Sequence, residues 1–426
     1  MRIVVLGAAG MIGRVICRDL ADYGGVDEIV AADLDQAAAQ AVAAGLGGRA
    51  TAARADVTDA PGLAALLRGA ACCLNGVNYY FNLDVMRACL RAGVHYIDLG
   101  GLFHMTRRQL ELDGEFRQAG LTAILGLGSC PGIANVHAGY LAGLLDTVHS
   151  IRIYNGATPD VGDSLAPAYT LQTIFDEIIE PAMVFRDGEF RELPPVSEDE
   201  HYPFREPIGY ARAHLSLHSE VATIPLSLKD QGIRECFFKI TAFGYSEKAF
   251  DQLKFLAGLG LMSAEPIELA GDVPGLAEVR TLPAGARTGA AASTRQMVRV
   301  RPRDVLMQAL AAAPASEKHG GHGFKDIATE ARGVKDGRTI TLRVDTTAWP
   351  KPDWNVSGGT FLVASPPAIV ARWLAEGRLV RPGVLPPEVA VDPEPFFAEL
   401  ARRGAQTELT TTAPLTPTPQ PLSPNP

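Results

Sequence analysis

Short apolar runs alternate with amphipathic stretches through the first third of the 426-residue sequence. Each run has the length of a buried strand, and apolar residues at helical spacing follow it. The runs predicted as strands are residues 2–6, 28–33, 50–55, 71–74, 94–97 and 121–125. Helices are predicted to begin near residues 11, 35, 61, 82 and 105. Because strands joined by helical crossovers form parallel sheets, the pattern predicts a doubly wound, Rossmann-type α/β fold.

The first predicted strand ends in a glycine-rich turn. Gly7, Gly10 and Gly13 follow at three-residue spacing, and a helical stripe begins at Met11. Glycine lets the backbone approach a pyrophosphate closely, and a helix N-terminus directs its amides and positive dipole end toward that anion. The turn therefore predicts a dinucleotide site, unless it is the glycine-rich turn of another kind of α/β protein. The expected contacts are Gly7, Ala9, Gly10, Met11, Ile12 and Gly13.

The second predicted strand ends at Asp33, where a ribose-binding acid is expected after such a turn. A carboxylate there accepts hydrogen bonds from the ribose hydroxyls, which favours NAD over NADP. Leu34 follows and offers no cation to a 2′-phosphate, whereas Arg14 keeps NADP possible. We expect Asp33 and Leu34 to contact the cofactor, although Asp33 could instead cap the next helix.

Two further strand ends extend the predicted cofactor site, because ligands of such sheets bind beyond the carboxyl ends of the strands. Asp56 and Val57 are expected beside the adenine, although Asp56 could instead cap the helix that begins near Pro61. Asn75 and Gly76 are expected beside the nicotinamide ribose, although Asn75 could equally close the strand end.

After residue 146 the regular alternation of strands and helices is lost. Strands are predicted at 150–155, 236–243, 296–300 and 339–345, with a helix at 169–179, which indicates an antiparallel α+β region. From residue 356 the pattern is helical again, and we expect these helices to pack back on the first domain. The expected division is a dinucleotide-binding domain (1–130), an α+β substrate and dimerisation domain (131–350), a returning segment (351–404) and a disordered tail rich in proline and threonine (405–426).

Several stretches occur in an order that is similar to one family: the glycine turn, residues 56–59 and 75–82, VHYIDLGG (94–101) and GSCPG (128–132). Together they resemble the saccharopine dehydrogenase-like reductases, and within that group the pattern is most similar to lysine 6-dehydrogenase. The resemblance spans roughly residues 1–404. It implies an NAD(P)-dependent oxidoreductase that acts on a C–N bond of an amino acid or polyamine, such as oxidative deamination of the lysine ε-amine.

Two other functions stay open at this stage. A condensing reductase of the saccharopine or carboxynorspermidine type would join an amine to an aldehyde acid. A non-catalytic sensor would bind the dinucleotide without turnover.

The implied chemistry needs an acid–base group beside the nicotinamide. His104 is a candidate because histidine exchanges protons near neutral pH, and Asp98 is another unless it only holds the glycine turn after it. The full set of catalytic candidates is Tyr80, Asp98, His104 and Cys130. In the middle region a polar cluster could hold the substrate carboxylate and amine, or could be a strand pair with solvated charges. The expected substrate contacts are Tyr79, Asn82, Gly101, Arg212, His218 and Glu220.

Bulk composition limits the partners. The net charge of −9 argues against nucleic acid and anionic membranes, and no apolar run has the length of a membrane span. The first apolar run is a strand broken by glycine, which does not fit a signal peptide. The six cysteines show no zinc spacing, so no metal site is expected, and free thiols are typical of a reducing cytoplasm. We expect a cytoplasmic homodimer that binds NAD and a small amine or amino-acid substrate.

Overall fold

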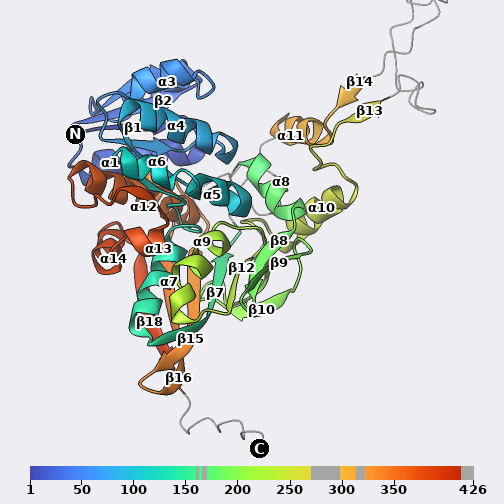
Figure 1. Cartoon of the computed structure of the whole chain (residues 1–426). Coiled ribbons are helices and arrows are strands. Elements are labelled where there is room, and N and C mark those ends of the chain that lie inside the picture. The colour runs from blue at the N-terminus through green and yellow to red at the C-terminus, as the bar shows by residue number, and fades with distance from the viewer. Residues whose placement is uncertain (160–162, 166–169, 270–297, 313–321, 414–426) are drawn as a thin grey trace, which may run out of the picture.

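The computed structural model describes residues 1–159, 163–165, 170–269, 298–312 and 322–413. Figure 1 shows a layered N-terminal unit in blue and a second, larger sheet in green and orange beside it. In the C-terminal part of the chain, in red, α12 (Gly358–Ala375) lies against α1 (Met11–Tyr23) of the N-terminal unit. Among the described residues, no helix is both long enough and apolar enough to cross a membrane.

A seven-stranded parallel sheet holds the N-terminal unit together, in the order β17-β6-β5-β4-β1-β2-β3. All six strands predicted from the apolar runs are present, so the Rossmann-type prediction is confirmed, and β17 adds a seventh from the C-terminal part of the chain. The strands are β1 (Arg2–Leu6), β2 (Glu28–Asp33), β3 (Ala50–Arg54), β4 (Cys72–Asn75), β5 (His95–Asp98), β6 (Thr122–Ile124) and β17 (Gly383–Leu385).

Helices connect these strands and bury their apolar faces on the sheet. The helix predicted from residue 105 onward is two helices, α5 and α6, separated by residues 111–112. The helices of this unit are α1 (Met11–Tyr23), α2 (Gln36–Ala44), α3 (Ala60–Leu67), η1 (Tyr79–Phe81), α4 (Asn82–Ala92), α5 (Leu102–Leu110) and α6 (Asp113–Gln118).

The second sheet is mixed rather than antiparallel. Its main order is β10-β11-β12-β7-β15-β16-β18, with β8 and β9 added beside β12. β7 and β12 are parallel, because the long connection between them includes a helix and a hairpin and can cross over. Its strands are β7 (Thr147–Ala157), β8 (Ala182–Arg186), β9 (Glu189–Leu193), β10 (Glu200–Pro203), β11 (Tyr210–Leu215), β12 (Glu235–Ile240), β15 (Lys325–Lys335), β16 (Arg338–Ala348) and β18 (Gln406–Thr412).

The remaining elements surround this sheet or return to the first one. β13 (Ile267–Leu269) and β14 (Val298–Val300) form a separate two-stranded sheet. The other helices are α7 (Ile133–Leu144), α8 (Leu171–Ile179), α9 (Glu220–Ser227), η2 (Lys229–Gln231), α10 (Glu247–Gly258), α11 (Pro302–Ala312), η3 (Pro352–Trp354), α12 (Gly358–Ala375), α13 (Pro387–Ala390) and α14 (Pro393–Arg402).

Part of the predicted tail is ordered, which corrects the expectation of disorder from residue 405. β18 pairs antiparallel with β16, with Gln406 opposite Thr347 and Thr412 opposite Thr341. Threonine is a good strand former, and β16 offers an edge with unpaired backbone groups. Residues 414–426 of the predicted tail lie outside the described residues.

A buried ion pair ties the returning segment to the first helix. The Arg403 guanidinium donates to both oxygens of Asp19 at 2.9–3.0 Å, and Ser365 Oγ donates to the same carboxylate at 2.7 Å. Asp19 and Arg403 are both buried. Since α12 also packs against α1, the C-terminal segment completes the core beneath the glycine turn.

Candidate active site

Close backbone contacts shape the turn between β1 and α1. Gly7 has φ +70°, and a Cβ there would lie 2.8 Å from the carbonyl oxygen of Gly76. A Cβ on Gly13 would lie 2.1 Å from the carbonyl oxygen of Gly7, so neither position accepts a larger residue without a shift. Gly10 precedes α1, and no side chain caps that helix N-terminus. The turn therefore has no side chain at Gly7, Gly10 or Gly13 and lies at a positive helix end, which fits a dinucleotide pyrophosphate.

Asp33 lies beside this turn at the end of β2. Its carboxylate accepts hydrogen bonds from Ala9 N at 3.0 Å and from Asp35 N at 3.2 Å. Asp35 caps the next helix instead, because its carboxylate accepts from Ala38 N. The alternative role of Asp33 as a helix cap is thus excluded, and its half-buried carboxylate remains beside the glycine turn. Leu34 next to it is exposed.

The end of β3 carries Asp56 and Val57, which remain predicted adenine contacts. The Asp56 carboxylate accepts from the Thr58 hydroxyl at 2.6 Å and from Thr58 N at 3.0 Å, and these bonds lower its pKa. Asp59 caps α3 through Gly62 N, so the alternative of Asp56 as that cap is excluded. Val57 is half-buried beside it.

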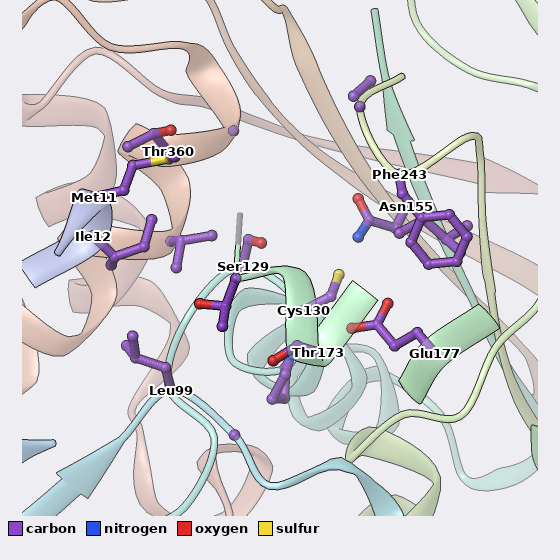
Figure 2. A pocket seen from close by; sticks show the side chains of 18 of the residues that line it. Met11, Ile12, Leu99, Ser129, Cys130, Asn155, Thr173, Glu177, Phe243 and Thr360 are labelled. Atoms are coloured by element: carbon purple, nitrogen blue, oxygen red, sulfur yellow. The ribbon is translucent and has the colours of Figure 1, made fainter. Parts of the chain in front are cut away.

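A cavity of about 300 Å³ lies where the glycine turn, the second sheet and the N-terminal end of α12 meet. Figure 2 shows Met11, Ile12 and Thr360 on one side and Asn155, Glu177 and Phe243 on the other, with Ser129 and Cys130 between them. The cavity therefore joins the predicted cofactor turn to side chains of the second domain. Of the predicted site residues, those that line it are Gly10, Met11, Ile12, Gly13, Gly76, Tyr79, Cys130 and His218.

Lys325 and Asn155 lie on one face of the second sheet and line this cavity. Lys325 on β15 stands opposite Ala157, and Asn155 on β7 stands opposite Ile327, which makes the two polar residues diagonal neighbours. Burial lowers the pKa of Lys325, although the nearby Cys130 and acidic groups oppose this. Asn155 is 5% exposed, and its Oδ1 has no hydrogen-bond partner. Neither residue is predictable from the sequence, because a polar residue near a strand end resembles an ordinary edge position.

His218, which lines the cavity, forms a buried pair with Glu220. His218 Nδ1 contacts Glu220 Oε2, and the imidazole stacks on Phe238 at 3.8 Å between ring centroids. Burial alone would lower the pKa of His218, but the Glu220 carboxylate outweighs it, and the pKa is raised. Burial also raises the pKa of the Cys130 thiol, and the Glu220 charge adds to this. His218 and Cys130 line the cavity, so their roles as substrate contact and catalytic residue stay predictions, whereas Glu220 does not line it.

Arg212 lies outside the site, which corrects its prediction as a substrate contact. Its guanidinium contacts Glu247 and lies 3.6 Å from Asp199 and 3.7 Å from Asp251. It does not line the cavity. The side chain is partly exposed, so the alternative interpretation, a strand with solvated charges, holds for this residue.

Asp98 fixes the backbone of two glycine turns and does not face the cavity, so its prediction as an acid–base group is corrected. Its carboxylate accepts from Gly126 N at 2.7 Å, Gly100 N at 2.9 Å and Gln109 Nε2 at 2.6 Å. Burial raises its pKa although these donors oppose the rise. Asp98 is 1% exposed and does not line the cavity. The alternative role, fixing the glycine turn that follows, is the one the geometry supports.

Asn75 and Asn82 belong to the same internal network. Asn75 Nδ2 donates to Asn82 Oδ1 at 2.9 Å, and Asn82 Nδ2 donates to Gly100 O at 3.1 Å. Gly101 N donates to the Ser219 hydroxyl at 3.3 Å. Both asparagines and Gly101 are buried, and none of the three lines the cavity. Their predicted ligand contacts are therefore corrected, because their polar groups are used to fix strand ends.

The last two catalytic candidates also lie off the cavity. His104 is exposed on α5 and packs edge-on against Phe103. Tyr80 is 43% exposed, and its hydroxyl donates to Asp176 at 2.5 Å. Neither residue lines the cavity, so neither is placed to exchange a proton with a ligand there.

The fold and the glycine cradle define the class of a dinucleotide-dependent oxidoreductase. Comparison with known families places the chain more narrowly. Residues 3–124 match the saccharopine dehydrogenase NADP binding domain, and residues 128–405 match the saccharopine dehydrogenase C-terminal domain. The chain belongs to the saccharopine dehydrogenase family, whose members act with NAD(P) on amine-containing substrates. The predicted family and enzyme class are thus confirmed.

The individual relatives have low sequence identity to this chain. The chain is 24% identical over 418 residues to the carboxyaminopropylagmatine dehydrogenase of Synechocystis sp., covering 95% of this chain and 96% of that protein. It is 23% identical to the carboxynorspermidine synthase of Vibrio cholerae, covering 76% of this chain and 74% of that protein. The apo saccharopine dehydrogenase (L-Glu forming) of Saccharomyces cerevisiae has the same fold, with a TM-score of 0.69 at 18% identity over 97% of this chain and 100% of that one.

Proposed function

We propose that this protein is an NAD(P)-dependent reductase that joins a primary amine to the aldehyde of a carboxyl-bearing chain and reduces the resulting C=N bond. The observation that carries the proposal is the presence of both charge signs, Lys325 and His218 together with Glu177, in the cavity beside the glycine turn. A substrate with an amine and a carboxylate requires both signs in one site. The names of the two relatives describe amines that carry such a chain. They favour condensation over the lysine ε-deamination predicted from the sequence.

The cofactor would be held by residues described above. The glycine turn would hold the pyrophosphate, and Asp33 would accept hydrogen bonds from the ribose hydroxyls. Bound NAD(P)H supplies the hydride that reduces the C=N bond. Because Asp33 repels a 2′-phosphate, we propose NAD as the preferred form, although the family model is named for NADP.

Lys325 is the residue we assign to proton transfer. Its lowered pKa makes the neutral amine more available near neutral pH than in an ordinary lysine. As the amine, Nζ would take the proton that the substrate nitrogen loses when it attacks the aldehyde carbon. The aldehyde oxygen takes a proton from solvent as this bond forms, which gives the carbinolamine hydroxyl. As the ammonium, it would donate the proton with which the carbinolamine hydroxyl leaves as water. The same two steps in reverse hydrolyse the C=N bond.

Glu177 and Asn155 would stabilise the nitrogen side of the substrate. Glu177 is 3% exposed, and its charge acts on both Lys325 and His218. A carboxylate at this wall favours the positive iminium that precedes reduction. Asn155 Oδ1 has no partner, so a substrate N–H would satisfy it.

A homodimer and a cytoplasmic location are also proposed. The second domain carries exposed apolar side chains on α10 and at its end, among them Phe255 (66% exposed) and Leu259 (60% exposed). Apolar surface of this kind supports self-association. Size-exclusion chromatography with light scattering measures the mass directly, and a monomer at micromolar concentration would contradict the dimer.

The experiment compares Lys325→Met with Lys248→Met, a lysine that is exposed in an ion pair with Asp163. NADH and NADPH oxidation is followed with an aldehyde that carries an amino-acid head group, combined with agmatine, short diamines or lysine. Loss of a proton-transfer group should lower kcat by roughly 10²–10⁴-fold without changing NADH affinity, whereas Lys248→Met should match the wild type. Equal kcat in all three proteins would overturn the role of Lys325.

The same assay separates the competing functions. NAD reduction with lysine alone, and no oxidation of NADH by any aldehyde–amine pair, would replace condensation with ε-deamination. Cofactor binding without turnover in either direction would support the sensor.

A further inference from the structure

A polar cluster joins three distant parts of the chain at the edge of the cavity. The Asp176 carboxylate on α8 accepts from the hydroxyls of Tyr79 at 2.7 Å and Tyr80 at 2.5 Å, both in the loop after β4. Its other oxygen accepts from Arg303 Nη2 on α11 at 2.7 Å. One carboxylate thus takes three donors, and the loop of the nucleotide-binding sheet is held to two helices of the second domain.

Arg303 extends the cluster to a fourth segment. Its Nε donates to the carbonyl oxygen of Met262, just after α10, and its Nη1 lies 3.4 Å from the Tyr80 hydroxyl. Asp176 is 4% exposed and Arg303 7% exposed, so their charges interact where water is largely excluded. Removing one partner would leave the other charge buried and uncompensated, which makes the pair a strong constraint on geometry.

Both ends of this cluster are next to residues that line the cavity. Tyr79 itself lines it, and Glu177, which follows Asp176 on α8, lines it too. Tyr79 belongs to the nucleotide-binding side and Glu177 to the substrate side, so a shift of α8 would change the distance between these two walls. The Tyr79 and Tyr80 rings are 4.4 Å apart between centroids, which keeps the two hydroxyls together.

We infer that Asp176 and Arg303 are positioning residues that fix α8 against the loop after β4, and so set the spacing of Tyr79 and Glu177 across the cavity. They do not touch the reacting atoms themselves. Tyr80 belongs to this cluster as a donor, which explains its polarity without a catalytic role. Only the kinetic test of these positioning roles depends on the proposed function.

The first measurement needs no turnover. Hydrogen exchange is followed in the peptides that cover residues 76–86 and 171–179, in wild type, Arg303→Met, Arg303→Lys and the control Arg186→Met. Arg186 pairs with Glu198 at the surface of the second sheet, away from the cavity. Arg303→Met should speed exchange in both peptides together, because each has lost its shared anchor. Arg303→Lys keeps the charge and should recover part of the protection, and Arg186→Met should leave both peptides unchanged.

The second measurement separates positioning from general destabilisation. In the condensation assay, Arg303→Met should lower kcat/KM for the amine and aldehyde by roughly 10- to 100-fold, while NADH affinity stays as in wild type. If Arg303→Met is too unstable to purify, Tyr80→Phe removes one donor from an exposed ring and should give a smaller effect in the same direction.

The outcomes are distinct. Exchange and kcat/KM that stay unchanged in a folded Arg303→Met or Tyr80→Phe protein would overturn the inference. If wild type itself shows no turnover, the proposed function fails, and the exchange experiment still decides the role of the cluster.

Discussion

The glycine turn gives the sharpest test of the proposed cofactor site, because alanine substitutions at two of its glycines should have different effects. A Cβ on Gly13 would lie 2.1 Å from the Gly7 carbonyl oxygen and 2.8 Å from Ala8 Cα, both backbone atoms. The Gly7 carbonyl oxygen is held in place, because it accepts a hydrogen bond from Gly10 N at 3.0 Å. Gly10 is different, since its backbone is extended and its Cβ would meet only the Gly7 carbonyl oxygen, at 3.2 Å.

We therefore expect Gly13→Ala to damage the fold and Gly10→Ala to damage the cofactor site. The overlap at Gly13 is about 1 Å, and overpacking of this kind costs at least roughly 1–3 kcal/mol of unfolding free energy. Gly10→Ala should keep its unfolding curve within about 0.5 kcal/mol of wild type. Its methyl group stands in the cavity, so the Kd for NADH should rise by at least tenfold, or about 1.4 kcal/mol.

Thermal unfolding of the apo proteins and NADH fluorescence titration measure the two effects separately. If Gly13→Ala is as stable as the wild type, the turn can accommodate a methyl group at this position, which would contradict the close contacts seen in the structure. Wild-type NADH affinity of a folded Gly10→Ala protein would refute the assignment of the turn as the pyrophosphate cradle.

Three other outcomes are expected. Asp33→Asn keeps an acceptor for Ala9 N but loses the charge, so the ratio of kcat/KM for NAD to that for NADP should fall by roughly tenfold; a constant ratio would remove Asp33 from cofactor choice. Arg403→Met leaves Asp19 buried without its partner and should lower the free energy of unfolding, measured in urea, by about 3–5 kcal/mol. The double variant Asp19→Asn/Arg403→Met should recover part of this loss. Burial, with the Asp345 charge, raises the pKa of Asp326 from 3.8 to about 7. Because this folded-state pKa is above the unfolded value, stability falls as the pH rises through that interval, and Asp326→Asn should raise the Tm more at about pH 8 than at about pH 4. An equal change in Tm at both pH values would contradict the raised pKa of Asp326.

The first sheet was predictable because its signals are local. Each strand is a short apolar run, and Gly7, Gly10 and Gly13 mark the turn wherever they occur after such a run. Asp33 follows at the strand end that the glycine turn requires. These features depend on neighbours in the sequence, so no knowledge of the second domain was needed to find them.

The catalytic side of the cavity was not predictable in the same way. Asp98 and Asn82 have the same local setting as a ligand-binding residue, and only their burial and their donors show that they fix turns. Lys325 reaches the cavity because β15 pairs with β7, a pairing between segments far apart in the sequence. Arg212 and His218 are close in sequence, yet only His218 faces the cavity, because the chain turns from β11 into α9 between them.

The Asp19–Arg403 pair has a consequence for how the chain is made. The carboxylate is synthesised with the first helix, and its guanidinium partner emerges from the ribosome almost four hundred residues later. Until then α1 lacks both this charge and the face of α12 that covers it. The nucleotide-binding unit therefore cannot reach its final packing until Arg403 has left the ribosome. Its first helix stays incompletely covered until that point, and a premature stop before Arg403 would leave the helix exposed to proteolysis.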